Sequence, residues 1–254
     1  MTAQSSTLIE ALNAYRGIVC AVGAGGKKSV LYQLVREHAG HFALTTTVRM
    51  TRFPEDFEAE RIVDDETMLA DRVLAAARSG SVAYACQSKK TGRHSGVAPE
   101  MIRSLHEQGG FDASFVKADG ARMRWIKAPK AGEPVLVPGA DVVIPVVSAL
   151  AIGKPLDERV AHRIERVAAV TGVAPGNLLT PEAVGRLLAS DAGALQGSAG
   201  GRVAPVINMV DNECQEELAR AAATAAIQMT SRFDRVVLCC LRRSSSPVVA
   251  VVTR

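Results

Sequence analysis

A glycine-rich segment near the start of the chain carries the residue types needed to hold phosphate. Glycines let a backbone bend around an anion and turn several N–H groups inward. A helix that begins at such a bend adds unpaired amides and the positive end of its dipole, and a lysine neutralises phosphate charge. We therefore predict a phosphate-binding loop made of Gly23, Ala24, Gly25, Gly26, Lys27, Lys28 and Ser29.

The residues on either side of this loop predict the elements that position it. An apolar run at 17–22 is typical of a buried strand, and the amphipathic stretch that follows the loop predicts a helix to about Ala39. Strand, glycine loop and helix in this order are typical of a nucleoside triphosphate site, whose usual pattern is G-x-x-x-x-G-K-[S/T].

The match to that pattern is incomplete. Aligned on Gly26-Lys27, the first glycine becomes Ala21, and Lys28 stands where a Ser or Thr hydroxyl would hold Mg²⁺. Ser29 lies one position later, and a helix turns by roughly 100° per residue, so its side chain points in another direction. The pattern therefore favours phosphate binding and leaves weak nucleoside triphosphatase activity as an open alternative.

A second alignment, on Lys28-Ser29, places a lysine and a hydroxyl correctly. It also puts Lys27 and Val22 where the pattern has glycines. We prefer the first alignment, because Gly25-Gly26 then form the tight bend.

Asp119 follows an apolar strand predicted at 111–118 and precedes Gly120. A carboxylate at the end of such a strand can reach Mg²⁺ bound to phosphates, so we predict Asp119 and Ser29 as metal ligands, with Lys27 and Asp119 as the catalytic pair. The alternative is an aspartate that starts a turn or caps a helix.

A polar segment, Asn208-Met209-Val210-Asp211, follows another predicted strand at 203–208. GTPase-like proteins read the base at this point with Asn-Lys-x-Asp. We predict that Asn208 buttresses the loop and Asp211 borders the base, with Met209 in place of the lysine. A polar loop before the N-cap of the helix predicted at 212–230 is an equal alternative.

Composition predicts the fold. The 254 residues are 48% apolar and only 4% aromatic, so the core is built from Ala, Val, Leu and Ile, which favours a buried parallel sheet. Strands alternate with helices along the chain, among them a helix predicted at 157–171, and the segments 46–60 and 87–96 are predicted as loops. The last two strands, at 236–240 and 248–252, are joined by a serine-proline turn. We predict one α/β domain over 1–254: a three-layer P-loop NTPase-like fold with a mainly parallel, doubly wound sheet and an antiparallel C-terminal edge hairpin.

The same composition argues against several partners. Few aromatic residues and a scattered net charge of +4 argue against a nucleic-acid surface. No apolar run approaches the length of a membrane span. The five cysteines form no C-x-x-C pair, which argues against a zinc site and fits the reducing conditions of a cytoplasmic protein.

Several segments together resemble a known family. They are 22–27, 45–50, 118–121, 127–129, 133–135, 153–157 with His162-Arg163, and 208–211. Their identity and order resemble the YqeC family, described as selenium-dependent molybdenum hydroxylase accessory proteins. The resemblance implies a P-loop nucleotide-binding fold, Mg²⁺ with ATP or GTP as cofactors, and a molybdenum hydroxylase or its molybdenum cofactor as partner.

Three positions depart from the family's usual residues. The family usually has Gly-Lys-Thr-Thr where this chain has Lys28, Glu-Ala-Asp-Gly where it has Lys117, and Asn-Lys-x-Asp where it has Met209. Two of these changes place a lysine near the expected metal and phosphates. They leave three hypotheses open: a nucleotide-dependent accessory protein, a non-hydrolysing scaffold that binds an anion or cofactor, and a small-molecule kinase.

Overall fold

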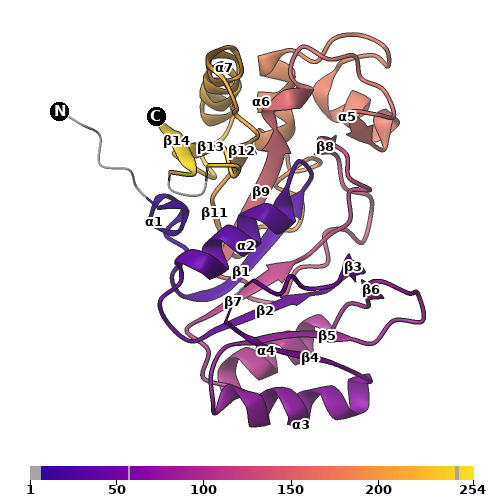
Figure 1. Cartoon of the computed structure of the whole chain (residues 1–254). Coiled ribbons are helices and arrows are strands. Elements are labelled where there is room, and N and C mark those ends of the chain that lie inside the picture. The colour runs from indigo at the N-terminus through magenta and orange to yellow at the C-terminus, as the bar shows by residue number, and fades with distance from the viewer. Residues whose placement is uncertain (1–6, 57, 244–245) are drawn as a thin grey trace, which may run out of the picture.

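A computed structural model describes residues 7–56, 58–243 and 246–254. The main sheet is made of ten strands: β1 (Gly17–Gly23), β2 (Phe42–Thr46), β4 (Glu60–Asp64), β5 (Val82–Cys86), β7 (Ala113–Lys117), β9 (Val142–Ser148), β11 (Arg202–Val203), β12 (Val206–Asn208), β13 (Arg235–Cys239) and β14 (Val248–Thr253). Their order is β14-β13-β12-β9-β1-β7-β2-β5-β4, with β11 paired to β9 (Figure 1).

The sheet confirms the predicted α/β class. Every paired strand runs parallel to its neighbour except β14, which pairs with β13 in the antiparallel sense and forms the predicted edge hairpin. Residues 244 and 245, in the predicted serine-proline turn of this hairpin, lie outside the described residues.

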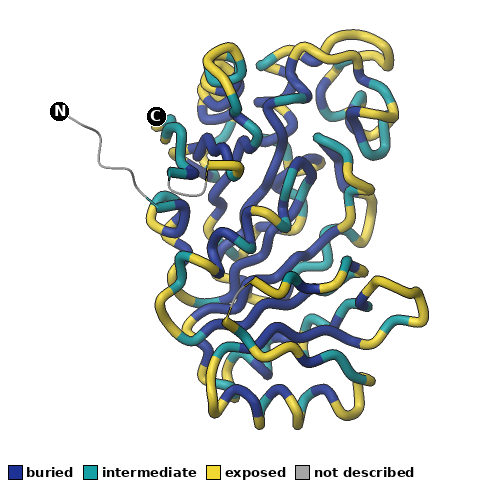
Figure 2. Tube along the Cα trace, in the orientation of Figure 1, coloured by how far each residue is buried: buried dark blue, intermediate teal, exposed yellow. Residues whose placement is uncertain are grey.

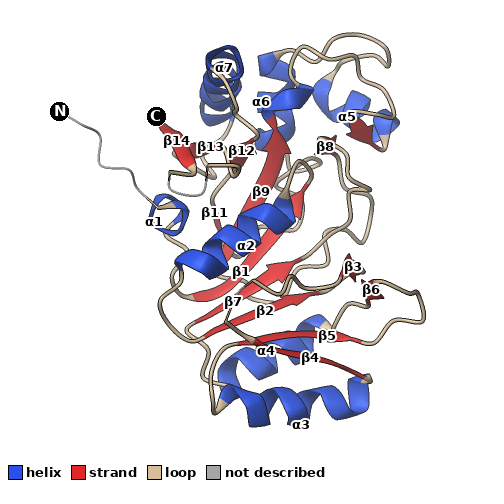
Figure 3. Ribbon diagram, viewed as in Figure 1, coloured by secondary structure: helices blue, strands red, loops and turns tan. Residues whose placement is uncertain are grey.

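Helices cover both faces of the sheet (Figure 3). They are α1 (Leu8–Leu12), α2 (Lys27–Glu37), α3 (Glu66–Ala77), α4 (Pro99–Gln108), α5 (Ile164–Thr171), α6 (Pro181–Ala189) and α7 (Glu213–Met229), with a 3₁₀ turn at Ala149–Ala151. Alternate residues of β1 face opposite layers: Val19 and Ala21 pack with α1 and α2, whereas Ile18 and Cys20 pack with α3 and α4. The helices α5, α6 and α7 pack on that second face beneath β12 and β13. The inner strands are consequently buried along most of their length (Figure 2), whereas the edge strands β4 and β14 are largely intermediate or exposed.

Two small sheets, each of two strands, occupy segments that were predicted as a helix or as loops. A helix was expected over 157–171, but α5 begins only at Ile164. Asp157 accepts hydrogen bonds from the N–H groups of Arg159 and Val160, which closes a turn, and β10 (Ala161–His162) then pairs with β8 (Ile126–Lys127). Helical periodicity does not register such a local side-chain turn.

The other small sheet lies within segments that were predicted as loops. β3 (Met50–Thr51) pairs with β6 (Arg93–His94), and so ties the predicted loops 46–60 and 87–96 together. The strand expected over 203–208 is split into β11 and β12, because Pro205 has no N–H to donate to the ladder.

β1 lies between β7 and β9 in the sheet. The chain leads from β1 toward the β4 edge and from β9 toward the β14 edge, so the strand order reverses between β1 and β9. Ligands of open α/β sheets bind outside the carboxyl ends of the strands at such a point. The glycine loop, Asp119, Ser148 and Asn208 all lie at this carboxyl edge. In the described part of the chain, no helix combines the length and the apolar character needed to cross a membrane.

Candidate functional site

The loop between β1 and α2 depends on its glycines. Gly25 has φ +72° and Gly26 has φ +113°, backbone conformations that residues other than glycine rarely adopt. A Cβ at Gly25 would come within 2.5 Å of the Ser148 backbone nitrogen, and one at Gly26 within 2.3 Å of Asn208 Nδ2. The bend therefore has no room for any residue larger than glycine at either position.

The N–H groups of the loop fall into two sets. Those of Gly23, Ala24 and Gly25 donate within the protein, to Asp119 Oδ2 (2.9 Å), Val146 O (2.8 Å) and Arg124 O (3.0 Å). This differs from the expectation that the glycines of the bend turn several N–H groups toward an anion. From Gly26 to Ser29, no acceptor among the described residues meets the N–H groups, and no side chain caps α2. The anion-binding capacity is therefore concentrated at the start of α2.

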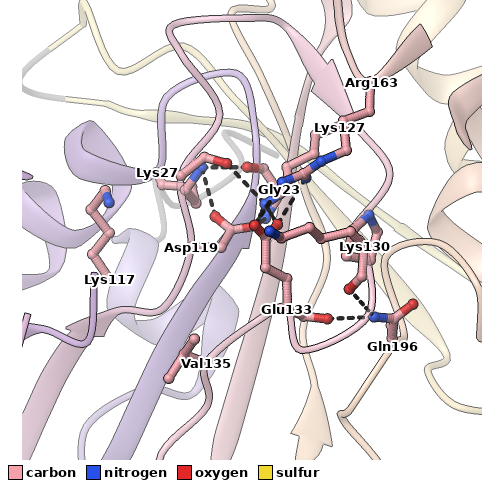
Figure 4. Close-up of polar contacts among 12 residues, drawn as sticks. Gly23, Lys27, Lys117, Asp119, Lys127, Lys130, Glu133, Val135, Arg163 and Gln196 are labelled. Atoms are coloured by element: carbon pink, nitrogen blue, oxygen red, sulfur yellow. Dashed lines mark hydrogen bonds and ion pairs between the residues drawn. The ribbon is translucent and has the colours of Figure 1, made fainter. Parts of the chain in front are cut away.

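Lys27, the first residue of α2, lies back over the loop (Figure 4). Its Nζ lies 2.9 Å from Asp119 Oδ1 and also donates to the Gly23 carbonyl. The side chain is only 6% exposed, and burial lowers the pKa of Lys27 while Asp119 opposes that shift. The structure thus brings the predicted pair Lys27 and Asp119 into direct contact.

Asp119 is held by a second lysine as well. Lys127, from β8, lies 2.8 Å from Asp119 Oδ2 and 2.6 Å from Glu133 Oε2, and it donates to the Gly120 carbonyl at 2.8 Å. The Lys127 side chain is fully buried. Both oxygens of Asp119 are therefore in contact with ammonium groups.

Glu133 continues this network to the surface of the site. Arg163 binds it through two parallel contacts, Nη1 to Oε2 at 2.8 Å and Nη2 to Oε1 at 2.6 Å. Burial alone would raise the pKa of Glu133, but the hydrogen bonds from Arg163 and Lys127 lower it to about 2. We call Lys27, Asp119, Lys127, Glu133 and Arg163 the ion chain, because their charges alternate in sign along it.

Two further lysines lie near the loop and contact neutral oxygens. Lys28 Nζ donates to Thr51 Oγ1 at 2.7 Å, and Lys117 Nζ donates to the Arg49 carbonyl at 3.2 Å. Among the described residues, neither lysine has a carboxylate within ion-pair distance. Burial lowers the pKa of Lys117 to about 7, and the like charge of Lys27 adds to that effect. Lys28 and Lys117 are the uncompensated lysines of the site.

The polar segment after β12 meets the loop at one residue. Asn208 Nδ2 donates to the Gly25 carbonyl at 2.9 Å, the contact that a buttressing asparagine requires. Met209 has φ +62°, and its sulfur accepts from Ser148 Oγ. Asp211 instead accepts from Cys240 Sγ at 3.1 Å.

An open depression of about 640 Å³ lies next to Asp211 at the start of α7. Its lining is Val210, Asn212, Glu213, Cys214, Glu216, Arg243 and Val249. None of these residues belongs to the glycine loop, so this depression and the loop are separate features. Binding of a base by Asp211 stays a prediction.

The predicted metal ligands do not come together. Ser29 is exposed and makes no contact with Asp119, whose oxygens already meet two ammonium groups and an amide. No cluster of three or more His, Cys, Asp or Glu suitable for a metal occurs among the described residues. Direct coordination of Mg²⁺ by Asp119 would place a divalent cation beside Lys27 and Lys127, which like-charge repulsion opposes. The residues as they stand therefore do not fit a directly bound Mg²⁺.

Sequence reasoning assigned no role to Lys127, Glu133 or Arg163, which complete the ion chain. Lys127 follows the apolar Trp125 and Ile126, and a lysine in such a stretch is a weak signal of a buried ion pair. Nothing local to Glu133 or Arg163 connects either of them with Asp119.

The sequence was compared with known proteins. The sequence model of the family described as "YqeC protein" matches residues 19–165, more than half of the chain. The match includes the glycine loop and the whole ion chain, and it ends before Asn208. A curated relative, the "Uncharacterized protein YqeC" of Escherichia coli (strain K12), is 28% identical over 162 residues, which is 62% of this chain and 62% of the relative. The match thus spans less than two thirds of the relative's length.

Proposed function

This chain belongs to the YqeC family, and we propose that it binds the phosphates of a nucleotide, ATP or GTP, at the start of α2. The observation that carries this proposal is the row of N–H groups from Gly26 to Ser29 that have no acceptor among the described residues. A helix start with free amides and an adjacent lysine favours a phosphate group.

The contact between Asn208 and the loop supports a nucleotide over a simple anion. Asn208 fixes the Gly25 carbonyl, and the segment that follows it runs on to Asp211 at the same carboxyl edge. A ligand with phosphates at α2 and a base toward Asp211 would span the two segments.

The accessory role is a separate part of the proposal. The family resemblance supports a protein that assists maturation of molybdenum-containing hydroxylases or insertion of their cofactor, in the cytoplasm. In this role, nucleotide binding would alter the contact between the chain and its client. Retention of a purified molybdenum hydroxylase on the immobilised chain, with and without nucleotide, tests it.

Calorimetric titration with ATP, GTP and their diphosphates tests the binding step. We expect saturable binding that Lys27→Ala weakens at least about tenfold, because the variant leaves the charge of Asp119 uncompensated beside the loop, where it repels phosphate. Arg16→Ala is the matched control, since Arg16 is exposed at the amino end of β1, at the opposite edge of the sheet. Absence of heat with every nucleotide would refute nucleotide binding.

A scaffold that binds without hydrolysis is the second candidate. It is favoured by the contacts of Asp119, whose two oxygens are taken by Lys27, Lys127 and the Gly23 N–H. A metal could bind this carboxylate only by displacing one of these contacts. Phosphate release that disappears in Lys27→Ala would instead support a nucleoside triphosphatase. The small-molecule kinase stays a prediction without an assigned acceptor site.

A further inference from the structure

We infer that the anion site at the start of α2 works without a divalent cation, because Lys28 and Lys117 supply the positive charge that Mg²⁺ would otherwise bring. The inference rests on the proposed function and names the ligand of that same site: a metal-free di- or triphosphate. Three observations carry it, and each concerns contacts of described residues.

The first observation is that the carboxylate expected to hold a metal is already neutralised. Asp119 contacts Lys27 at 2.9 Å and Lys127 at 2.8 Å, and it is 2% exposed. A metal bound there would have to displace the ammonium of Lys27 or of Lys127, both of which are buried. Removing one partner of a buried pair is costly, since it leaves an uncompensated charge.

The second observation is where the uncompensated lysines stand. Lys28 is the second residue of α2, and its own N–H is one of those without an acceptor. Lys117 ends β7 and lies opposite Ala21 of β1 and Thr46 of β2, so it faces the same carboxyl edge. Lys28 therefore stands among the amides that would bind the anion, and Lys117 lies at the same edge, close enough for the charges of Lys27 and Lys28 to act on it.

The third observation is that positive charge accumulates around the loop. The like charges of Lys27, Lys28 and Lys127 all act on Lys117, and Arg93 acts on Lys28. The nearby carboxylates, Asp119 and Glu133, both belong to the ion chain and are paired with its cations. A bound anion with several negative charges would relieve the repulsion among these lysines. In the same way, Mg²⁺ relieves the repulsion among phosphate charges at other sites.

The test measures binding of inorganic tripolyphosphate, and then of GTP and ATP, in EDTA and in excess Mg²⁺. We expect binding in EDTA that is as tight as in Mg²⁺ or tighter, because bound Mg²⁺ shields the phosphate charge. Lys28→Met and Lys117→Met should each weaken binding in EDTA at least about tenfold. Arg16→Met, which removes one positive charge at the opposite edge of the sheet, should leave it unchanged.

A converse variant sharpens the test. Lys28→Thr restores a hydroxyl at the position of the usual pattern and removes one of the two lysines. We expect weaker binding in EDTA that Mg²⁺ partly recovers, whereas the original chain gains nothing from Mg²⁺. Circular dichroism of each variant shows that it is folded before its binding is compared.

The outcomes separate the two proposals. Binding that occurs only with Mg²⁺ overturns the metal-free site and leaves the proposed function intact. Binding in EDTA that neither Lys28→Met nor Lys117→Met weakens also overturns it. If no phosphate compound binds in either buffer, the proposed function itself is wrong.

Discussion

Two pairs of lysines surround the same loop and are held in opposite ways. Lys27 and Lys127 are buried against Asp119, and Lys127 also against Glu133. In the described part of the chain, the ammonium of Lys28 donates to the hydroxyl of Thr51, that of Lys117 donates to the carbonyl of Arg49, and neither forms an ion pair. The first pair has its charge cancelled within the protein, so it serves to hold the segments together. The second pair keeps its charge available for a ligand.

The family match covers the residues of both lysine pairs. Residues 19–165 contain the glycine loop, the uncompensated lysines and the whole ion chain. The ion chain links the start of α2, the segment after β7, β8 and the residue before α5, and so joins residues as far apart in the sequence as Lys27 and Arg163. We infer that its first role is to fix these segments around the loop, and that stability measurements can separate the two lysine pairs.

Replacing Lys127 should have the largest effect on stability. Lys127→Met leaves Asp119 and Glu133 without their shared ammonium, and we expect a loss of about 3–5 kcal/mol in the free energy of unfolding. Urea denaturation at neutral pH measures it. Lys154→Met, at an exposed lysine, is the control and should leave the stability unchanged. A loss no larger than the control's would contradict the structural role of the ion chain.

Glu133→Gln should destabilise the protein in a pH-dependent way. The pKa of Glu133 is lowered in the folded state, so its ion pairs contribute stability above its ordinary pKa of 4.5, and that contribution is lost as pH falls toward about 2. We expect a loss of about 2 kcal/mol at pH 7 that shrinks between pH 4.5 and 2. Unfolding curves of both proteins across this range measure it. A difference that stayed constant with pH would mean that Glu133 acts through packing.

Lys117→Met should change stability in the opposite direction. The pKa of Lys117 is lowered to about 7 when folded, from an ordinary 10.5, so the folded protein pays for a buried charge below pH 7 and is relieved as pH rises toward 10.5. We expect Lys117→Met to stabilise the unliganded protein by about 1–3 kcal/mol at pH 6, and by less at pH 10. Thermal and urea unfolding at both pH values would measure the gain in stability. A loss of stability instead would mean that the charge of Lys117 is compensated within the protein, as the charges of Lys27 and Lys127 are.

Asn208→Ala should have the smallest effect. It removes one neutral hydrogen bond to the Gly25 carbonyl, and we expect a loss of about 1 kcal/mol with little dependence on pH. The same unfolding curves measure it. Because neither partner of this hydrogen bond is charged, the variant shows how much the loop contributes to the free energy of unfolding independently of the ion chain. A loss as large as that of Lys127→Met would mean that the ion chain stabilises the loop no more than this neutral hydrogen bond does.

Much of the fold could be predicted from the sequence, because the signals are local. The apolar run at 17–22, the glycine bend and the following amphipathic stretch predicted β1, the loop and α2 to within three residues. The C-terminal hairpin was confirmed as well. The helix expected over 157–171 failed at its first half, since an aspartate turn and the pairing of β10 with β8 outweigh helical periodicity there.

The sequence by itself determined that a glycine loop joins a strand to a helix, and that Asp119 and Asn208 end strands at the same edge. Those properties follow from backbone conformation and apolar periodicity, which each segment carries alone. Only the tertiary structure decided which lysines are neutralised. Lys27 and Lys28 are neighbours in the chain, yet one reaches Asp119 and the other Thr51. Charge pairing is fixed by which side chains meet in space, and Glu133 and Arg163 meet across 30 residues of chain.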